Sequence, residues 1–209
     1  MSTQNVQPAT ALVLRCCAAD MTSRNGFVWP GVGETAIAPD WRDDLECGGG
    51  LYGWLYGAGD HTASDYWRKD DANWLVLEVE ESGIRDLDCK CKFPSALVRF
   101  VGDKAAAAAY LVAHESRSVA CDVIGLSVVA GDHETAAAGP LGTATAGDSG
   151  TATAGYGGTA TAGGKGQIQI KYYNSKTDGY RTAVGYVGED GIKANVAYKL
   201  GADHKFIKA

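Results

Sequence analysis

The sequence lacks any long run of apolar residues, and none of its stretches approaches the roughly 20 that a membrane-spanning helix needs. Its opening residues, Met1 to Thr10, are polar and carry no basic residue, and only a short apolar run follows them. This pattern is unlike a secretory signal peptide. The absences favour a cytoplasmic protein without a membrane partner.

The sequence also lacks the spacings of metal sites. It has six cysteines, an even number, but Cys89 and Cys91 form a CxC motif and not the CxxC of a zinc knuckle. The four histidines are scattered along the chain. We therefore expect free, reduced thiols and neither a metal nor another cofactor.

Common enzymatic fingerprints are missing as well. The glycines Gly48 to Gly50 have neither the GxGxxG spacing of dinucleotide-binding folds nor the GxxxxGKS spacing of a P-loop, and no GxSxG elbow is present. A non-catalytic role is thus favoured over catalysis.

Basic charge is scarce over most of the chain. Residues 1–117 hold 11 basic against 17 acidic residues, residues 118–166 hold 1 against 4, and only residues 167–209 are basic, with 7 against 4. Extended nucleic acid requires a basic surface that displaces counterions. We therefore exclude it as a partner.

What the sequence does contain is an octapeptide repeat, with three direct copies between Gly142 and Gly166 and looser copies from Ser118 to Asn174. Thr-Ala-Thr-Ala alternates with period two, as in a short strand, and the flanking glycines permit tight turns. Short units that bury little alone must stack, which predicts a β-solenoid. Its alanine core would be thin, so we expect thick caps or a homo-oligomer.

The units AGDSGTAT and AGYGGTAT resemble the AGYGSTxT octapeptides of bacterial ice-nucleation proteins. The resemblance implies a solenoid that displays Thr-x-Thr rows. Here the units are few and contain a single tyrosine, Tyr156, so the ice face would be narrow, and a structural or ice-binding repeat protein is one alternative function. Repeats of this type are also similar to TATAG repeats of bacteriophage proteins, which implies a phage protein in the host cell cytoplasm.

The flanking regions complete the predicted fold. Residues 11–16, 74–80 and 97–101 read as strands, with a hairpin return at 84–87, and Asp103 caps a helix over 104–115. The prediction is an α+β N-terminal domain (1–117), a Thr/Ala/Gly octapeptide-repeat β-solenoid (118–174) and a small, β-rich C-terminal cap (175–209).

The segment from Asp20 to Trp67 combines closely spaced glycines with aromatic residues, which suggests a backbone that approaches a flat ligand. The alternative is a glycine-rich turn under a small aromatic core. With basic residues from the cap, the candidate ligand-binding residues are Arg15, Arg24, Trp29, Tyr52, Trp54, Tyr56, Arg181 and Lys193.

The leading hypothesis from these features is an oligomeric binding protein that sequesters a small nucleotide-like ligand, as an anti-defence protein of a phage would. A further alternative is an enzyme that uses NAD. Arg15, Tyr52 and either Glu78 or Glu80 follow an order similar to that of the Arg, Tyr and Glu of ADP-ribosyltransferases.

Overall fold

The computed structural model describes residues 8–209. Most of the polar opening stretch, Met1 to Thr10, therefore lies outside the described residues. The chain divides into two compact units, Met1–Cys121 and Asp122–Ala209. Among the described residues, no helix has the length and apolar character needed to cross a membrane.

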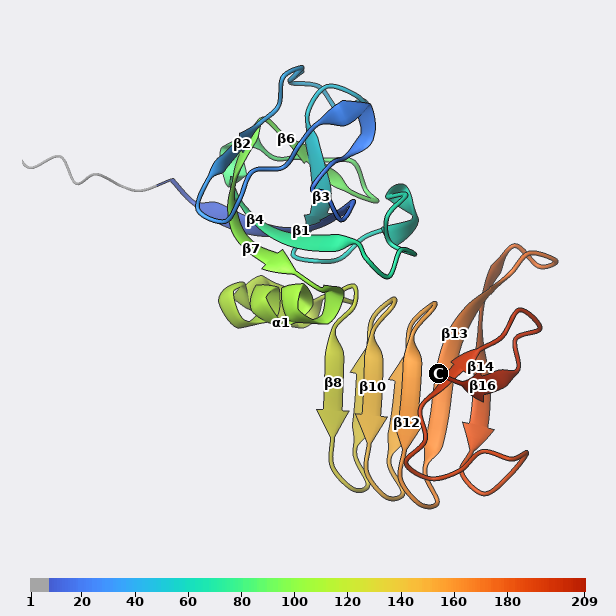
Figure 1. Cartoon of the computed structure of the whole chain (residues 1–209). Helices are drawn as coiled ribbons and strands as arrows, with labels where there is room; N and C mark the ends of the chain where they lie inside the picture. Colours follow the sequence, from blue (N-terminus) through green and yellow to red (C-terminus); the bar gives the residue numbers. More distant parts are fainter. Residues whose placement is uncertain (1–7) are drawn as a thin grey trace, which may run out of the picture. The chain divides into compact units, whose positions relative to one another are not determined.

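The first unit is built on one antiparallel sheet of seven strands (Figure 1). Its strand order is β2-β7-β4-β1-β3-β6-β5. The strands are β1 (Thr10–Cys17), β2 (Thr35–Ile37), β3 (Leu51–Leu55), β4 (Asn73–Glu80), β5 (Arg85–Asp86), β6 (Cys91–Phe93) and β7 (Ser95–Gly102).

The centre of this sheet is apolar on both faces, because β1 and β4 are nearly continuous apolar runs. One face of β1 contributes Val13 and Cys17 to the main core cluster. The helix α1 (Lys104–His114) packs against β1, β4 and β7 and buries Ala107, Ala108 and Leu111. Its N-cap is Asp103, whose carboxylate accepts from the Ala106 N–H at 2.9 Å, as predicted.

Two local predictions for this unit need correction. The expected hairpin return after β4 does not form, because β4 pairs with β1 and β7, while β5 pairs with β6. The α+β description is also wrong, since the one α-helix among the described residues accompanies seven strands. Short strands such as β2, β5 and β6 carry too few residues for a period-two pattern to reveal them.

The second unit contains the octapeptides. Its strands are β8 (Ser127–Ala130), β9 (Thr135–Ala138), β10 (Thr143–Ala146), β11 (Thr151–Ala154), β12 (Thr159–Ala162), β13 (Gln167–Asn174), β14 (Gly179–Tyr186), β15 (Tyr198–Leu200) and β16 (Phe206–Lys208). Consecutive octapeptides alternate between a five-stranded sheet, β16-β15-β12-β10-β8, and a four-stranded sheet, β14-β13-β11-β9 (Figure 1).

Within each of these sheets the repeat strands are parallel and pair with the strand sixteen residues away. Thr143 lies opposite Thr159, and Ala144 lies opposite Ala160. The alanines of both sheets point inward and join one core cluster with Ile168 and Ile170, whereas the threonines point outward and are partly exposed. The inward alanines and outward threonines follow directly from the period-two sequence.

Tight turns connect the octapeptides, and close packing between successive turns requires glycine at some positions. A Cβ on Gly155 would lie 2.6 Å from the backbone of Gly139 and Pro140 in the turn two octapeptides earlier. Gly157 has a φ of +69°, the left-handed conformation that the equivalent Leu141 and Ser149 also adopt. The turns are linked to one another, since the N–H of Leu141 donates to the carbonyl of Tyr156 at 2.9 Å.

The predicted fold class, including the β-solenoid and its separate cap, is therefore wrong. The protein is mostly β, and its strands form distinct sheets of seven, five and four strands. The strands expected to form a cap are members of the repeat sheets: β14 pairs antiparallel with β13, and β15 pairs antiparallel with β12. Bulky residues at Ile168, Ile170 and Tyr198 end the alanine pattern and carry these antiparallel additions.

The thin alanine layer predicts a sharp difference between the two sides of a repeat strand. Ala152→Leu would force three extra carbons between the packed sheets, and we expect the free energy of unfolding to fall by about 1–3 kcal/mol. Ala137→Leu makes the same change at an exposed position and serves as the control. Urea unfolding followed by circular dichroism compares the two, and equal stabilities would contradict the inward packing of Ala152.

Candidate functional site

A regular outer surface lies on the five-stranded sheet, and we call it the threonine face. It consists of the outward residues of β10 and β12, which are Thr143, Thr145, Thr159 and Thr161. Ser127 and the exposed Val129 of β8 continue the same two rows. The in-register pairing aligns the threonines in two straight rows across the strands.

The corresponding face of the four-stranded sheet is less uniform. Thr151 and Thr153 of β11 lie between Thr135 and Ala137 of β9 and Gln167 and Gln169 of β13. Only the central strand of this face therefore carries the Thr-x-Thr pair, whereas two neighbouring strands carry it on the threonine face.

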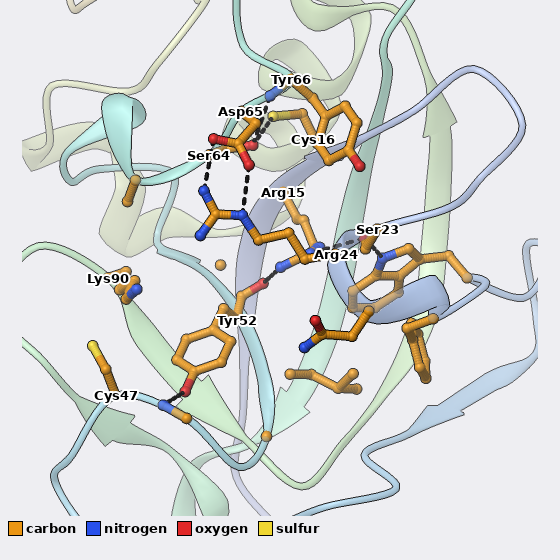
Figure 2. Close-up of a pocket in the computed structure, with 18 of the residues that line it drawn as sticks. Arg15, Cys16, Ser23, Arg24, Cys47, Tyr52, Ser64, Asp65, Tyr66 and Lys90 are labelled. Carbon is orange, nitrogen blue, oxygen red and sulfur yellow. Dashed lines mark hydrogen bonds and ion pairs between the residues drawn. The ribbon is translucent and has the colours of Figure 1, made fainter.

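A pocket of about 620 Å³ in the first unit is the second candidate site. Its walls come from the segments after β1, before and within β3, and after η2 (His61–Ala63). Figure 2 shows several of the polar residues that line it. The lining includes five of the predicted ligand residues, Arg15, Arg24, Trp29, Tyr52 and Trp54.

The side chain of Arg15 is held by neutral groups of the protein. Its guanidinium donates to the Tyr52 carbonyl at 2.5 Å and to the Ser23 hydroxyl at 2.9 Å, and it lies 4.7 Å from the centre of the Trp29 ring (Figure 2). Its Nε is buried without a hydrogen-bond partner. Burial lowers the pKa of Arg15, but a guanidinium remains charged in proteins.

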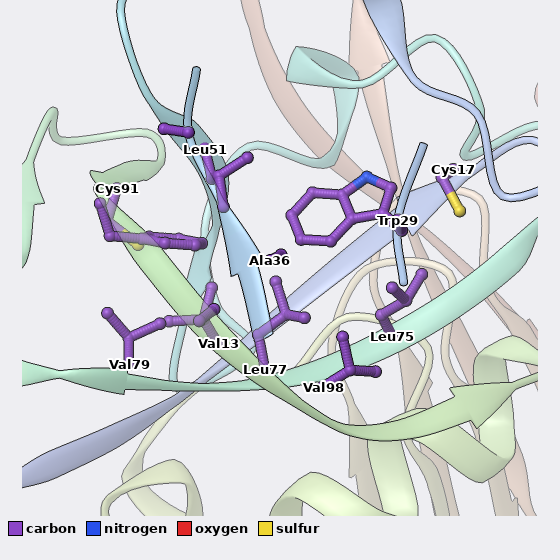
Figure 3. Close-up of a cluster of buried hydrophobic side chains, with 13 residues drawn as sticks. Val13, Cys17, Trp29, Ala36, Leu51, Leu75, Leu77, Val79, Cys91 and Val98 are labelled. Carbon is purple, nitrogen blue, oxygen red and sulfur yellow. The ribbon is translucent and has the colours of Figure 1, made fainter. Parts of the chain in front are cut away.

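Other predicted ligand residues also have structural contacts. Trp29 lies in the main core cluster (Figure 3), and its indole N–H donates to the Ser23 hydroxyl at 2.7 Å. The Trp54 ring stacks on Trp74, with centroids 5.8 Å apart. At the surface, the guanidinium of Arg24 forms an ion pair with Asp65 at 2.5 Å.

The three remaining predicted residues do not line the pocket. The guanidinium of Arg117 lies 4.6 Å from the centre of the Tyr56 ring. Arg181 and Lys193 are exposed residues of the second unit. Conversely, sequence reasoning missed the pocket residues Ser64 and Tyr66, which lie within the segment from Asp20 to Trp67, and Lys90, to which no sequence feature pointed.

The arrangement expected for an ADP-ribosyltransferase is also absent from this pocket. Arg15 and Tyr52 line it, but Glu78 and Glu80 do not. Glu78 instead forms an ion pair with Arg99 at 2.7 Å. Among residues 8–209, moreover, no group of three or more histidine, cysteine or acidic side chains is placed to hold a metal ion.

Comparison with known proteins gives a consistent result for the repeat. The chain is 37% identical over 108 residues to an ice nucleation protein of Pseudomonas syringae, a match that covers 51% of this chain and 9% of the relative. It is 35% identical over 112 residues to one of Pseudomonas fluorescens, with 53% of this chain and 9% of the relative covered. Ice nucleation protein InaU of Pantoea ananas is 32% identical over 114 residues, or 53% of this chain and 10% of the relative.

The chain thus spans about a tenth of the length of these curated relatives. No protein-family model matches it, and no solved structure does. The similarity of the octapeptides to those of ice-nucleation proteins is confirmed, while the phage origin stays a prediction. The nucleotide-sequestration hypothesis is wrong: the relatives are named for ice nucleation, and the pocket's arginine and tryptophan side chains are engaged by the protein itself.

All six cysteines are free in the structure, and their environments predict different reactivities. Burial raises the pKa of Cys91 to about 12 and that of Cys17 to about 11, so both remain protonated at pH 8, where the thiolate is the reactive form. Cys47, at the pocket, and Cys89 are exposed.

We therefore expect iodoacetamide at pH 8 to alkylate Cys47 and Cys89 of the folded protein well before Cys17 and Cys91. Peptide mass spectrometry after timed quenching measures the order. Labelling in denaturant, where all the thiols become accessible, is the control. Early modification of Cys91 under native conditions would contradict the burial of this residue on β6.

Proposed function

We propose that this chain is an ice-binding repeat protein and that the threonine face is the surface that adsorbs to ice. The observation that carries the proposal is the register of β10 with β12, which sets four threonines into two parallel rows. The names of the relatives support the same interpretation, because each is an ice nucleation protein.

The physical basis is the fixed spacing of a β-sheet. Neighbouring strands lie ~4.8 Å apart, and residues i and i+2 of a parallel strand lie ~6.6 Å apart. Each threonine of this face presents one hydroxyl, which can join a water network, and one methyl group, which packs against ordered water. Because χ1 of threonine is restricted by its branched Cβ, the array holds its geometry at little entropic cost.

The threonine face is favoured over the face of the four-stranded sheet for two reasons. It has the Thr-x-Thr pair on two adjacent strands, whereas the other face has it on β11 alone. On β13, Gln167 and Gln169 replace the threonines with longer, more flexible side chains that interrupt the array.

The size of the array favours adsorption to existing ice over nucleation. A nucleating template must hold enough water to form a crystal that grows, whereas adsorption needs only a patch that matches a crystal surface. The two complete Thr-x-Thr strands of the threonine face form such a patch. We therefore propose that the chain binds ice that has already formed.

The proposal is tested by substituting, in each sheet, the middle one of its three parallel repeat strands. Thr143→Leu/Thr145→Leu replaces both hydroxyls on β10 with bulky apolar groups. We expect at least a tenfold loss in the ratio of ice-bound to free protein, which corresponds to ~1.4 kcal/mol of lost contact free energy. Ice-affinity partitioning measures the ratio, and inhibition of ice recrystallisation is the second readout.

The matched control is Thr151→Leu/Thr153→Leu, the same change on β11, the middle parallel strand of the other sheet. It is expected to retain most ice affinity. Thr177→Leu, in an exposed turn, controls for added hydrophobicity. A wild-type protein that stays in the liquid fraction, or equal losses in the two double variants, would refute the assignment of the threonine face.

A further inference from the structure

The strand β14 leaves one edge of the four-stranded sheet open. It is eight residues long, contains no proline and pairs with β13 in an uninterrupted register. Its outward side chains include Tyr180, Val184 and Tyr186, which are 55%, 46% and 51% exposed. Proteins normally protect such an edge with charges, prolines or bulges. Here the only charged residue within the strand is Arg181.

The hydrogen-bonding pattern shows which residues of β14 face the open edge. Val187 donates its N–H to the Gly166 carbonyl at 3.0 Å, in line with the register of the hairpin. Backbone groups of an antiparallel strand point alternately to its two neighbours. The odd-numbered residues of β14 therefore bond to β13, and the even-numbered ones direct their N–H and C=O groups outward. These even-numbered residues are Tyr180, Thr182, Val184 and Tyr186.

We propose that β14 pairs antiparallel with β14 of a second copy of this chain, about a two-fold axis through Ala183. The hydrogen bonds require even-numbered residues of one copy to face even-numbered residues of the other. With the two-fold axis at Ala183, nearly the full length of both β14 strands is paired. In this register Tyr180 faces Tyr186 of the second copy, and Thr182 faces Val184. The homo-oligomer expected from the sequence is thereby given a specific interface, which does not depend on ice binding.

The side chains of β14 are complementary to one another in this register. Two tyrosine pairs would flank two pairs of β-branched residues, and both kinds of cross-strand pair stabilise sheets. Arg181, which is exposed, would lie beside Gly185, which has no side chain to obstruct it. The two-fold axis makes each of these contacts occur twice.

Charge is complementary beyond the ends of the strand as well. Lys176 lies in the turn before β14, and Glu189 and Asp190 lie in the turn after it; all three are exposed. Because the pairing is antiparallel, the turn before β14 in one copy approaches the turn after β14 in the other. Lys176 of each copy therefore approaches the acidic turn of its partner, although Asp178 in the same turn leaves that turn without a net charge.

The register is tested by two double variants that differ only in the sign of the charge at position 184. Thr182→Glu is common to both, and Lys171 lies opposite position 182 in the same chain, so the substitution suits the monomer. Adding Val184→Glu places two glutamates opposite each other twice in the dimer, whereas adding Val184→Lys places glutamate opposite lysine. We expect sedimentation velocity to show loss of the dimer for the Glu/Glu variant and its return for the Glu/Lys variant.

Val32→Glu/Ile37→Glu is the control, since it places the same charges at exposed apolar positions of the first unit and should leave the dimer intact. Circular dichroism of every variant checks that the fold is retained. A monomeric wild-type protein would overturn the proposal. So would a dimer that survives the Glu/Glu change, one that Glu/Lys fails to restore, or one that is lost in the control.

Discussion

The structure of the second unit depends on one constraint, the in-register pairing of parallel strands that are sixteen residues apart. This register stacks alanine on alanine inside and threonine beside threonine outside. A slip of one residue would exchange the two faces and bury hydroxyl groups in a space that fits methyl groups. The same pairing therefore sets both the core of the unit and the surface that we propose binds ice.

The turns and the C-terminal strands complete what the alanines alone cannot supply. Close backbone contact at Gly155 lets successive turns pack directly, and hydrogen bonds such as that from Leu141 to Tyr156 link the turns. Alanine methyls bury little apolar area, so larger residues such as Ile168 and Ile192 add the stabilisation where the repeat ends. The hairpin of β13 and β14 also leaves β14 as an open edge of the four-stranded sheet.

The pocket of the first unit shows how an aromatic, glycine-rich sequence can have a structural explanation. The glycines allow the backbone to fold tightly: a Cβ on Gly53 would lie 2.3 Å from the side chain of Val13. Trp29 and Trp54 are both buried and satisfy their indole N–H groups within the protein. The aromatic residues that suggested stacking on a ligand also make packing contacts within the first unit.

The sequence by itself determined the local features that arise from short-range periodicity: the strands β1, β4 and β7, the capped helix, and the inward alanines and outward threonines of the repeats. It also determined the similarity to ice-nucleation octapeptides, because that similarity lies in contiguous residues. The tertiary structure alone decided which strands pair, and therefore that the C-terminal strands join the repeat sheets and that the first unit is mostly β. Strand partners are distant in sequence and are selected by the packing of whole faces, which no local pattern encodes.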